Sequence, residues 1–88
     1  MSDLIRESDR IHARDDAGRL VAEITFPMVR PGVYCIDHTF VDPSLRGQGM
    51  ADRLVRAALE QIRANGGRAV ATCSYAAAWL ERHPEQAV

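Results

Sequence analysis

Hydrophobic and polar residues alternate along residues 20–28 with the period of two that is typical of a β-strand. Five hydrophobic side chains share one face of this segment: Leu20, Ala22, Ile24, Phe26 and Met28. A weaker alternation over residues 10–14 comes before it, and the sequence Asp15-Asp16-Ala17-Gly18 between the two is typical of a turn. The pattern therefore predicts an antiparallel hairpin over residues 10–28, while residues 1–9 are expected either to fray or to add an edge strand.

The next alternating segment, residues 33–41, is predicted to form a third strand, because it is rich in β-branched and aromatic residues. His38 and Phe40 lie on one face of this strand, and Thr39 and Val41 lie on the other. A short apolar run close to the C-terminus, residues 69–72, is predicted to be a buried strand.

Hydrophobic residues recur at helical spacing in the second half of the chain. They predict a helix over residues 50–64, whose apolar stripe consists of Ala51, Leu54, Val55, Ala58 and Ile62. The sequence Asn65-Gly66-Gly67 ends this helix with the residues of a left-handed cap. A last helix is predicted from Tyr75 to about Arg82, with Ser74 as its N-cap and Pro84 beyond its end.

The predicted order β-β-β-α-β-α indicates an α/β (α+β) domain with a mixed, mostly antiparallel sheet of about four strands and a C-terminal helix. Strand 33–41, the following helix and strand 68–72 form one β-α-β crossover, which is expected to be right-handed with parallel strands. The turn between the first strand and its helix therefore lies at the carboxyl edge of the sheet, where open α/β sheets bind ligands. With 88 residues, the chain is expected to be a single domain, residues 1–88, and a monomer or a weak homodimer.

Composition and charge narrow the choice of partners. The formal net charge of −1 argues against a nucleic-acid binder, and the presence of Arg without Lys is attributed to compositional bias. Cys35 and Cys73 make neither a disulfide framework nor a zinc motif, and no His/Cys/Asp/Glu grouping has the spacing of metal ligands. The sequence shows neither a membrane-spanning run nor a signal-peptide core, so a soluble cytoplasmic protein without a metal is expected.

The connection Leu45-Arg46-Gly47-Gln48-Gly49-Met50-Ala51 is the strongest candidate for a binding site. The N-terminus of a helix has backbone N–H groups without partners and a partial positive charge, and phosphate oxygens satisfy both. Gly47 and Gly49 allow close approach of the backbone and unusual dihedral angles, and Arg46 adds a charged donor. A P-loop is excluded because the chain has no Lys, and the dinucleotide fingerprint would place Asp52 where a small residue is needed.

Residues 40–54 resemble the acetyl-CoA-binding motif of the GNAT superfamily, the Gcn5-related N-acetyltransferases. In that motif an Arg or Gln is followed by two residues, a Gly, one residue, and a Gly or Ala; Arg46, Gly49 and Ala51 occupy these positions. Similarity to the small YjdJ-type branch extends over roughly residues 8–85, through Glu23, His38-Thr39, Asn65-Gly66, Cys73-Ser74-Tyr75 and residues 81–85. The resemblance implies a minimal GNAT-like fold without the N-terminal helices that build the substrate pocket of larger members.

This resemblance implies an acetyl-CoA-dependent N-acetyltransferase whose acceptor is a primary amine, in a small molecule or a peptide. It implies that the backbone of Phe40 and Val41 holds the pantetheine arm of coenzyme A. It also implies that the backbone of Arg46, Gly47, Gln48, Gly49, Met50 and Ala51 holds the diphosphate, and Ser74 is assigned to cofactor binding as well. Two other interpretations stay open, a non-catalytic acyl-CoA-binding or sensing module and an interaction domain whose glycine turn binds nothing.

Direct attack by an amine on the thioester of acetyl-CoA requires a base for the amine and an acid for the departing thiolate. The candidates are Cys73, His38 and Tyr75. Cys73 precedes a helix N-terminus, which depresses a thiol pKa, and it is an acid, a base, a transient acyl acceptor or simply a buried hydrophobic residue. Histidine as a residue type titrates near neutrality, which suits a base, so His38 is either the base or a hydrogen-bonded structural histidine. Tyr75 donates a proton to the thiolate or packs against a helix.

The remaining polar residues are assigned simpler roles. Glu23 either assists the reaction through water or is a solvated charge, and His12 and His83 are predicted to lie at the surface. Cys35, in the middle of its strand, is predicted to pack in the interior.

Overall fold

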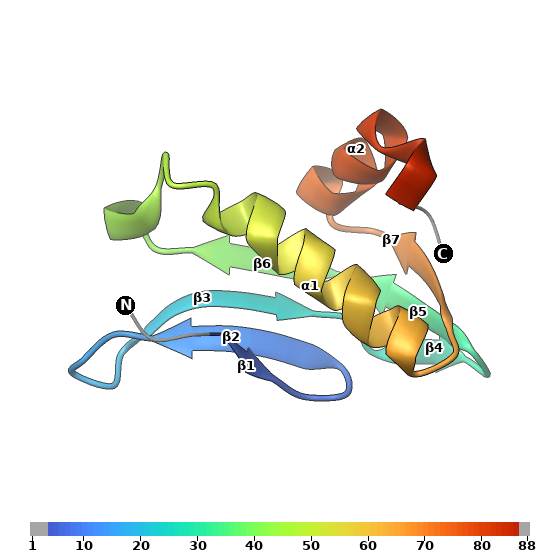
Figure 1. Cartoon of the computed structure of the whole chain (residues 1–88), viewed down its shortest axis with the longest axis horizontal. Helices are drawn as coiled ribbons and strands as arrows, with labels where there is room; N and C mark the ends of the chain where they lie inside the picture. The colour runs from blue at the N-terminus through green and yellow to red at the C-terminus, as the bar shows by residue number, and fades with distance from the viewer. Residues whose placement is uncertain (1–3, 87–88) are drawn as a thin grey trace.

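The computed structural model describes residues 4–86 of the chain, and Figure 1 shows how its strands and helices are arranged. In chain order the elements are β1 (Ile5–Arg6), β2 (Arg10–Arg14), β3 (Leu20–Thr25), β4 (Met28–Arg30), β5 (Val33–Ile36), β6 (His38–Val41), the 3₁₀ turn η1 (Pro43–Leu45), α1 (Met50–Ala64), β7 (Arg68–Ala71), α2 (Ser74–Arg82) and the 3₁₀ turn η2 (Pro84–Gln86). The predicted mixed α/β class is therefore confirmed.

The strands form two sheets, where the sequence pattern predicted one. The first sheet is antiparallel and has the order β1-β2-β3-β6, and the second has the order β4-β5-β7. Within the second sheet β5 and β7 are parallel, so β5, α1 and β7 form the predicted β-α-β crossover. The N-terminal segment adds the edge strand β1, while residues 1–3 of the expected frayed end lie outside the described residues.

The predicted strand 33–41 is divided at Asp37 because its two halves belong to different sheets. β5 pairs with β7, whereas β6 pairs with β3. At the division the Thr25 hydroxyl donates a hydrogen bond to the Asp37 carboxylate, and the Asp37 N–H donates to the Thr25 carbonyl. Cys35 and Ile36 are both buried although they are consecutive, so the simple alternation fails where the chain passes from one sheet to the other.

The predicted strand 20–28 is divided in the same way, between β3 and β4. Pro27 lacks an N–H and lies between the two strands. As a result, Phe26 is fully buried, whereas Met28, predicted on the same face, is 55% exposed.

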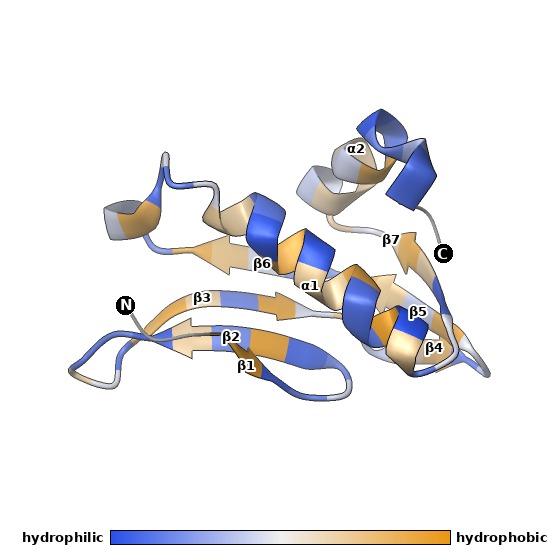
Figure 2. Ribbon diagram, viewed as in Figure 1, coloured by the Kyte–Doolittle hydropathy of each residue, from blue (hydrophilic) through white to orange (hydrophobic). Residues whose placement is uncertain are grey.

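The core lies between α1 and one face of the first sheet. Ile11, Ala13, Ala22 and Ile24 are fully buried there, and they face the buried stripe of α1: Met50, Leu54, Val55, Ala57, Ala58, Leu59 and Ile62. Figure 2 shows hydrophobic and hydrophilic residues alternating around α1 as the helix crosses the strands. Because α1 is fixed by this packing, its first turn has a defined position relative to the carboxyl end of β6.

Both helices begin and end close to the predicted residues. α1 spans Met50–Ala64 as predicted, and Gly66, with φ of 77°, follows its C-cap. α2 begins one residue early, so Cys73 is its N-cap and Ser74 is its first residue, which corrects the predicted cap. Neither helix of the described chain is long and apolar enough to cross a membrane.

Candidate functional site

The turn before α1 has the backbone conformation that its glycines predicted. Gly47 and Gly49 have φ angles of 81° and 73°, values that side-chain-bearing residues rarely adopt. Gly49 is the N-cap of α1 and provides no side-chain hydrogen bond to the helix. The first N–H groups of α1 therefore remain available to an anion, as at other helix N-termini that bind phosphate. A Cβ atom built on either glycine meets no heavy atom within 4 Å, so the turn leaves its surface open.

A cavity of about 420 Å³ opens in front of this turn. It is lined by residues from β6, the turn, the first turn of α1 and the start of α2: Thr39, Val41, Leu45, Arg46, Gly47, Gly49, Met50, Ala51, Asp52 and Tyr75. Such a volume is typical of a small-molecule site. The fold thus brings the turn residues together with Tyr75, which lies 26 positions after Gly49 in the chain.

The cavity lies where the two sheets separate. β6 is the edge strand of the first sheet, and β7 is the edge strand of the second. Pairing between β5 and β7 ends where the N–H groups of Thr72 and Cys73 both donate to the carbonyl of Ile36, at 3.1 Å each. Beyond this point β6 follows β3, so the backbone of β6 has one edge without a strand partner among residues 4–86. That edge is available to amide groups of a ligand.

Cys73 adjoins the cavity through Thr39. Its Sγ lies 3.5 Å from Oγ1 of Thr39, whose side chain lines the cavity. Burial by itself would raise the pKa of the Cys73 thiol, but hydrogen bonds from the Thr39 side chain and from the backbone of Ala76, Tyr75 and Thr39 oppose this effect, and the pKa is lowered overall. The N-terminus of α2 therefore acts on the thiol in the direction that the sequence predicted.

Tyr75 and Asp52 lie at the α2 end of the cavity. Burial, together with the negative charge of Asp52, raises the pKa of Tyr75, so the phenol keeps its proton at neutral pH. Asp52 accepts hydrogen bonds from Trp79 Nε1 at 2.7 Å and from Arg56 Nε at 2.8 Å. These hydrogen bonds, that of Trp79 first, lower the pKa of Asp52, so it is charged. The negative charge of Asp52 is therefore held in place by Trp79 of α2 and by Arg56 of α1, the helix to which Asp52 belongs.

His38 and Phe40 lie on the opposite face of β6 from the cavity. This outer face of the first sheet, defined by Arg10, His12, Glu23, His38 and Phe40, alternates with the face that packs on α1. His38 Nε2 lies 3.3 Å from Glu23 Oε1. His12 is only 6% exposed, so the prediction that it lies at the surface is wrong: neighbouring strands flank it on both sides.

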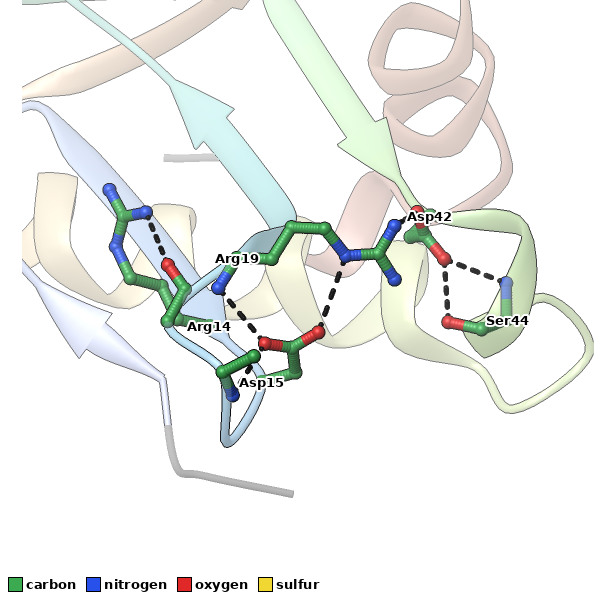
Figure 3. Close-up of polar contacts among 7 residues, drawn as sticks. Arg14, Asp15, Arg19, Asp42 and Ser44 are labelled. Carbon is green, nitrogen blue, oxygen red and sulfur yellow. Dashed lines mark hydrogen bonds and ion pairs between the residues drawn. The ribbon is translucent and has the colours of Figure 1, made fainter.

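A polar network fixes the chain just before the turn (Figure 3). Asp42 accepts hydrogen bonds from the backbone N–H and the hydroxyl of Ser44, at 3.0 and 2.6 Å. Arg19 extends from the β2–β3 hairpin to within 3.6 Å of Asp42, and it also contacts Asp15 at 3.3 Å. The hairpin therefore supports η1, the segment that leads into Arg46 and the glycines.

Residues 10–88 match the family of GCN5-related N-acetyl-transferases. The chain belongs to this family. Membership makes the protein an N-acetyltransferase by class, in agreement with the resemblance noted in the sequence. No curated protein matches the chain.

Solved structures of GNAT proteins have the same fold. A GCN5-like protein from Staphylococcus aureus is 32% identical, with a TM-score of 0.77 over 96% of this chain and 82% of that one. A GNAT family N-acetyltransferase from Escherichia coli, solved in complex with CoA, is 25% identical, with a TM-score of 0.63 over 70% of this chain and 38% of that one. A CoA-bound protein from Mycobacterium tuberculosis is 19% identical, with a TM-score of 0.69 over 86% of this chain and 47% of that one. The chain thus spans less than half the length of these two CoA-bound proteins.

The fold brings together some of the predicted GNAT site residues and separates others. Those that line the cavity are Val41, Arg46, Gly47, Gly49, Met50, Ala51 and Tyr75. Cys73 lies behind Thr39, while Gln48 is exposed and its side chain donates to the Ser44 carbonyl at 3.4 Å. Ser74, Phe40 and His38 do not line the cavity. Within residues 4–86, no group of three His, Cys, Asp or Glu residues is placed to hold a metal ion.

Sequence reasoning missed Thr39 and Asp52 as cavity residues, whereas Leu45 was part of the predicted connection without a role of its own. For Thr39 a signal was available, because alternation placed it with Val41 on the face opposite His38. For Asp52, the contact with Arg56 follows from their i,i+4 spacing on one helix, whereas the hydrogen bond from Trp79 depends on how α2 packs on α1.

We expect Asp42→Asn to lower the stability of the protein at neutral pH but not in strong acid. The Ser44 hydroxyl, followed by the Ser44 N–H, lowers the pKa of Asp42 below the ordinary value of an aspartate. A carboxyl group with a lowered folded pKa stabilises the protein above its unfolded pKa, and this contribution is lost as the pH falls through the folded value. Urea unfolding should therefore show a lower midpoint for the variant at pH 7 and equal midpoints below the lowered pKa. Equal midpoints at pH 7 would show that Asp42 does not stabilise η1.

Proposed function

We propose that this protein transfers an acetyl group from acetyl-CoA to a primary amine of a small molecule or a peptide. The observation that supports this proposal most directly is the cavity itself, which joins an uncapped helix N-terminus to a protonated tyrosine. Behind Thr39, which lines the cavity, lies a thiol of lowered pKa. A GNAT family N-acetyltransferase and a second protein of the same fold were solved in complex with CoA, which supports the choice of cofactor. The cytoplasmic location expected from the sequence stays a prediction.

The residues of the turn fit the diphosphate of coenzyme A. Backbone N–H groups from Gly47 to Ala51 lie at the N-terminus of α1, and Arg46 lines the cavity beside them. The unpaired edge of β6 at Phe40 and Val41 would bind the amides of the pantetheine arm. Bound in this way, acetyl-CoA would supply an activated acetyl group as a thioester.

The other end of the cavity provides groups that move protons. Tyr75 holds its proton at neutral pH and is the acid that we assign to the departing thiolate. We assign His38 as the base that accepts the proton of the incoming amine. Because His38 precedes Thr39 and lies on the outer face of the first sheet, the amine approaches from that face. Cys73 lies behind Thr39 and is assigned a supporting role, with its thiol contacting the Thr39 hydroxyl.

Binding and turnover test this proposal separately. Titration calorimetry with CoA and with acetyl-CoA, up to millimolar concentration, should show saturable heat. Release of free CoA should then be measured with spermidine, simple alkylamines and peptides with a free N-terminal amine. Binding without release of CoA from any of these amines would favour the non-catalytic acyl-CoA module instead. Absence of binding would overturn the cofactor assignment, and with it the proposed reaction.

We expect Tyr75→Phe to lower kcat about tenfold while the affinity for CoA stays unchanged. The substitution removes one hydroxyl from a side chain that is 37% exposed, so the packing of α2 should not change. Cys73→Ala provides the comparison, because it removes the thiol and keeps the tyrosine. If Tyr75→Phe has the wild-type rate and Cys73→Ala does not, the acid is the thiol and the roles assigned here must be exchanged.

A further inference from the structure

Five ionisable side chains form a continuous row across the outer face of the first sheet. Starting at β6, His38 Nε2 lies 3.3 Å from Glu23 Oε1, and Glu23 Oε2 accepts a hydrogen bond from Arg10 Nε at 2.6 Å. Arg10 continues the row to Glu7 Oε1 at 3.6 Å, and the other oxygen of Glu7 lies 3.8 Å from His12 Nε2. The row begins at the residue next to the cavity and crosses three elements, β6, β3 and β2.

Glu23 lies between His38 and Arg10 in this row, and each of its two oxygens contacts one of them. Its side chain is 17% exposed, whereas that of His38 is 51% exposed. The hydrogen bond with Glu23 is the largest of the effects that raise the pKa of Arg10, which is therefore a fixed positive charge. Arg10 holds Oε2 of Glu23, and the other oxygen, Oε1, is the one that lies 3.3 Å from His38 Nε2.

A carboxylate accepts hydrogen bonds and cannot donate them. With His38 Nε2 3.3 Å from Glu23 Oε1, a proton on Nε2 is the favoured arrangement of neutral His38, and Nδ1 then keeps the lone pair. A base that takes a proton from an amine needs such a lone pair on a nitrogen exposed to the acceptor. The arrangement consists of a base oriented by a second group that does not itself react, as in other acid–base sites.

We infer that Glu23 is a positioning residue that fixes the tautomer of His38, so that Nδ1 accepts the proton of the acceptor amine. This inference rests on the proposed function, because it assigns the base of the same reaction. Glu23 touches neither acetyl-CoA nor the amine in this assignment; it acts only through the imidazole ring.

Glu23→Gln is a sharp test because Arg10 determines which way the new amide points. The Arg10 guanidinium has only N–H donors, so the amide oxygen of Gln must face Arg10 and its NH₂ group must face His38. The NH₂ group then donates to Nε2 and forces the proton of the imidazole to Nδ1. The substitution keeps the size of the side chain and reverses the tautomer, so that no lone pair remains on Nδ1.

The experiment has two measurements. Long-range ¹H–¹⁵N NMR of the histidine rings, at a pH where His38 is neutral, should show the Nε2–H tautomer in the wild type and the Nδ1–H tautomer in Glu23→Gln. Steady-state kinetics with acetyl-CoA and the best amine of the panel should show kcat lowered at least tenfold, with the KM for acetyl-CoA unchanged. Glu7→Gln is the matched control, because it removes the other carboxylate that contacts Arg10 and leaves Glu23 in place; its tautomer and kcat should be those of the wild type.

The possible failures are distinguishable. If the wild type binds CoA but acetylates none of the amines, the proposed function fails, and the role of Glu23 in it fails too. If the wild type is active and Glu23→Gln has the same kcat, the positioning role alone is overturned. An Nδ1–H tautomer in the wild type would also overturn it. A fall in kcat in the Glu7→Gln control equal to that of Glu23→Gln would indicate a general effect of charge on the outer face and would contradict the specific role of Glu23.

Discussion

Gly49→Asp should lower the affinity for CoA by about 1000-fold and leave the protein folded. The new carboxylate would lie at the N-cap of α1, in the cavity that we assign to the diphosphate. Two like charges about 4 Å apart repel by about 4 kcal/mol at an effective dielectric constant of 20, which corresponds to about 1000-fold in affinity. The fold should survive, because a Cβ atom at Gly49 meets no heavy atom within 4 Å and Asp tolerates a positive φ better than most residues.

Gly49→Asn is the matched control for charge. It has nearly the same shape as Asp and also tolerates the left-handed conformation, at φ of 73°, but it carries no charge. We expect its affinity for CoA to remain within about tenfold of the wild type, since the difference in charge accounts for most of the effect. Calorimetry gives both affinities, and urea unfolding shows whether the two variants are equally stable. Equal loss of affinity in both variants would mean that shape, and not charge, determines binding at the turn.

The elements that the sequence predicted best are those set by local physics. The bounds of α1 follow from an apolar stripe of helical period and from Gly66, which comes directly after the C-cap and has a positive φ. The positive φ angles of Gly47 and Gly49 were likewise expected, because few other residues adopt them. Hydrophobic period and glycine conformation depend on a few neighbouring residues, so they can be derived without knowing the rest of the fold.

The division of the strands was not predictable in the same way. Period-two alternation continues through Asp37 and through Pro27, and nothing in it indicates which sheet a strand will join. That choice is made by partners far away in the chain, since β6 pairs with β3 and β5 pairs with β7. The separation of the sheets places Thr39 beside Cys73, so this part of the site could not be derived from local sequence.

The outer face illustrates the same limit for polar residues. Glu23 was assigned either to water-mediated assistance or to a solvated charge, and His12 to the surface. In the structure Glu23 contacts Arg10 and His38, and His12 is buried. Each of these contacts crosses between strands and depends on the register of β2, β3 and β6. Register follows from the packing of the whole sheet against α1, which the alternation of single residues does not define.

Trp79→Ala should destabilise the protein by about 3–5 kcal/mol, a large part of the 5–15 kcal/mol that is typical of a domain. Trp79 is 1% exposed, its ring stacks on His83 with centroids 3.9 Å apart, and the Arg56 guanidinium lies 5.1 Å from its centroid. It also holds α2 on α1 through its hydrogen bond to Asp52. Urea unfolding should therefore show a much lower midpoint.

The same substitution should weaken CoA binding, although Trp79 does not line the cavity. Tyr75 lies at the start of α2, and Asp52 loses the donor that helps to keep it directed at α2 when Trp79 is removed. Trp79→Phe separates packing from the hydrogen bond, because it keeps an aromatic ring but has no N–H; we expect it to cost only about 1–2 kcal/mol. If Trp79→Ala lowers stability but binds CoA with wild-type affinity, the position of α2 does not matter for the cofactor, and the contribution of Tyr75 to the site is limited to the chemical step.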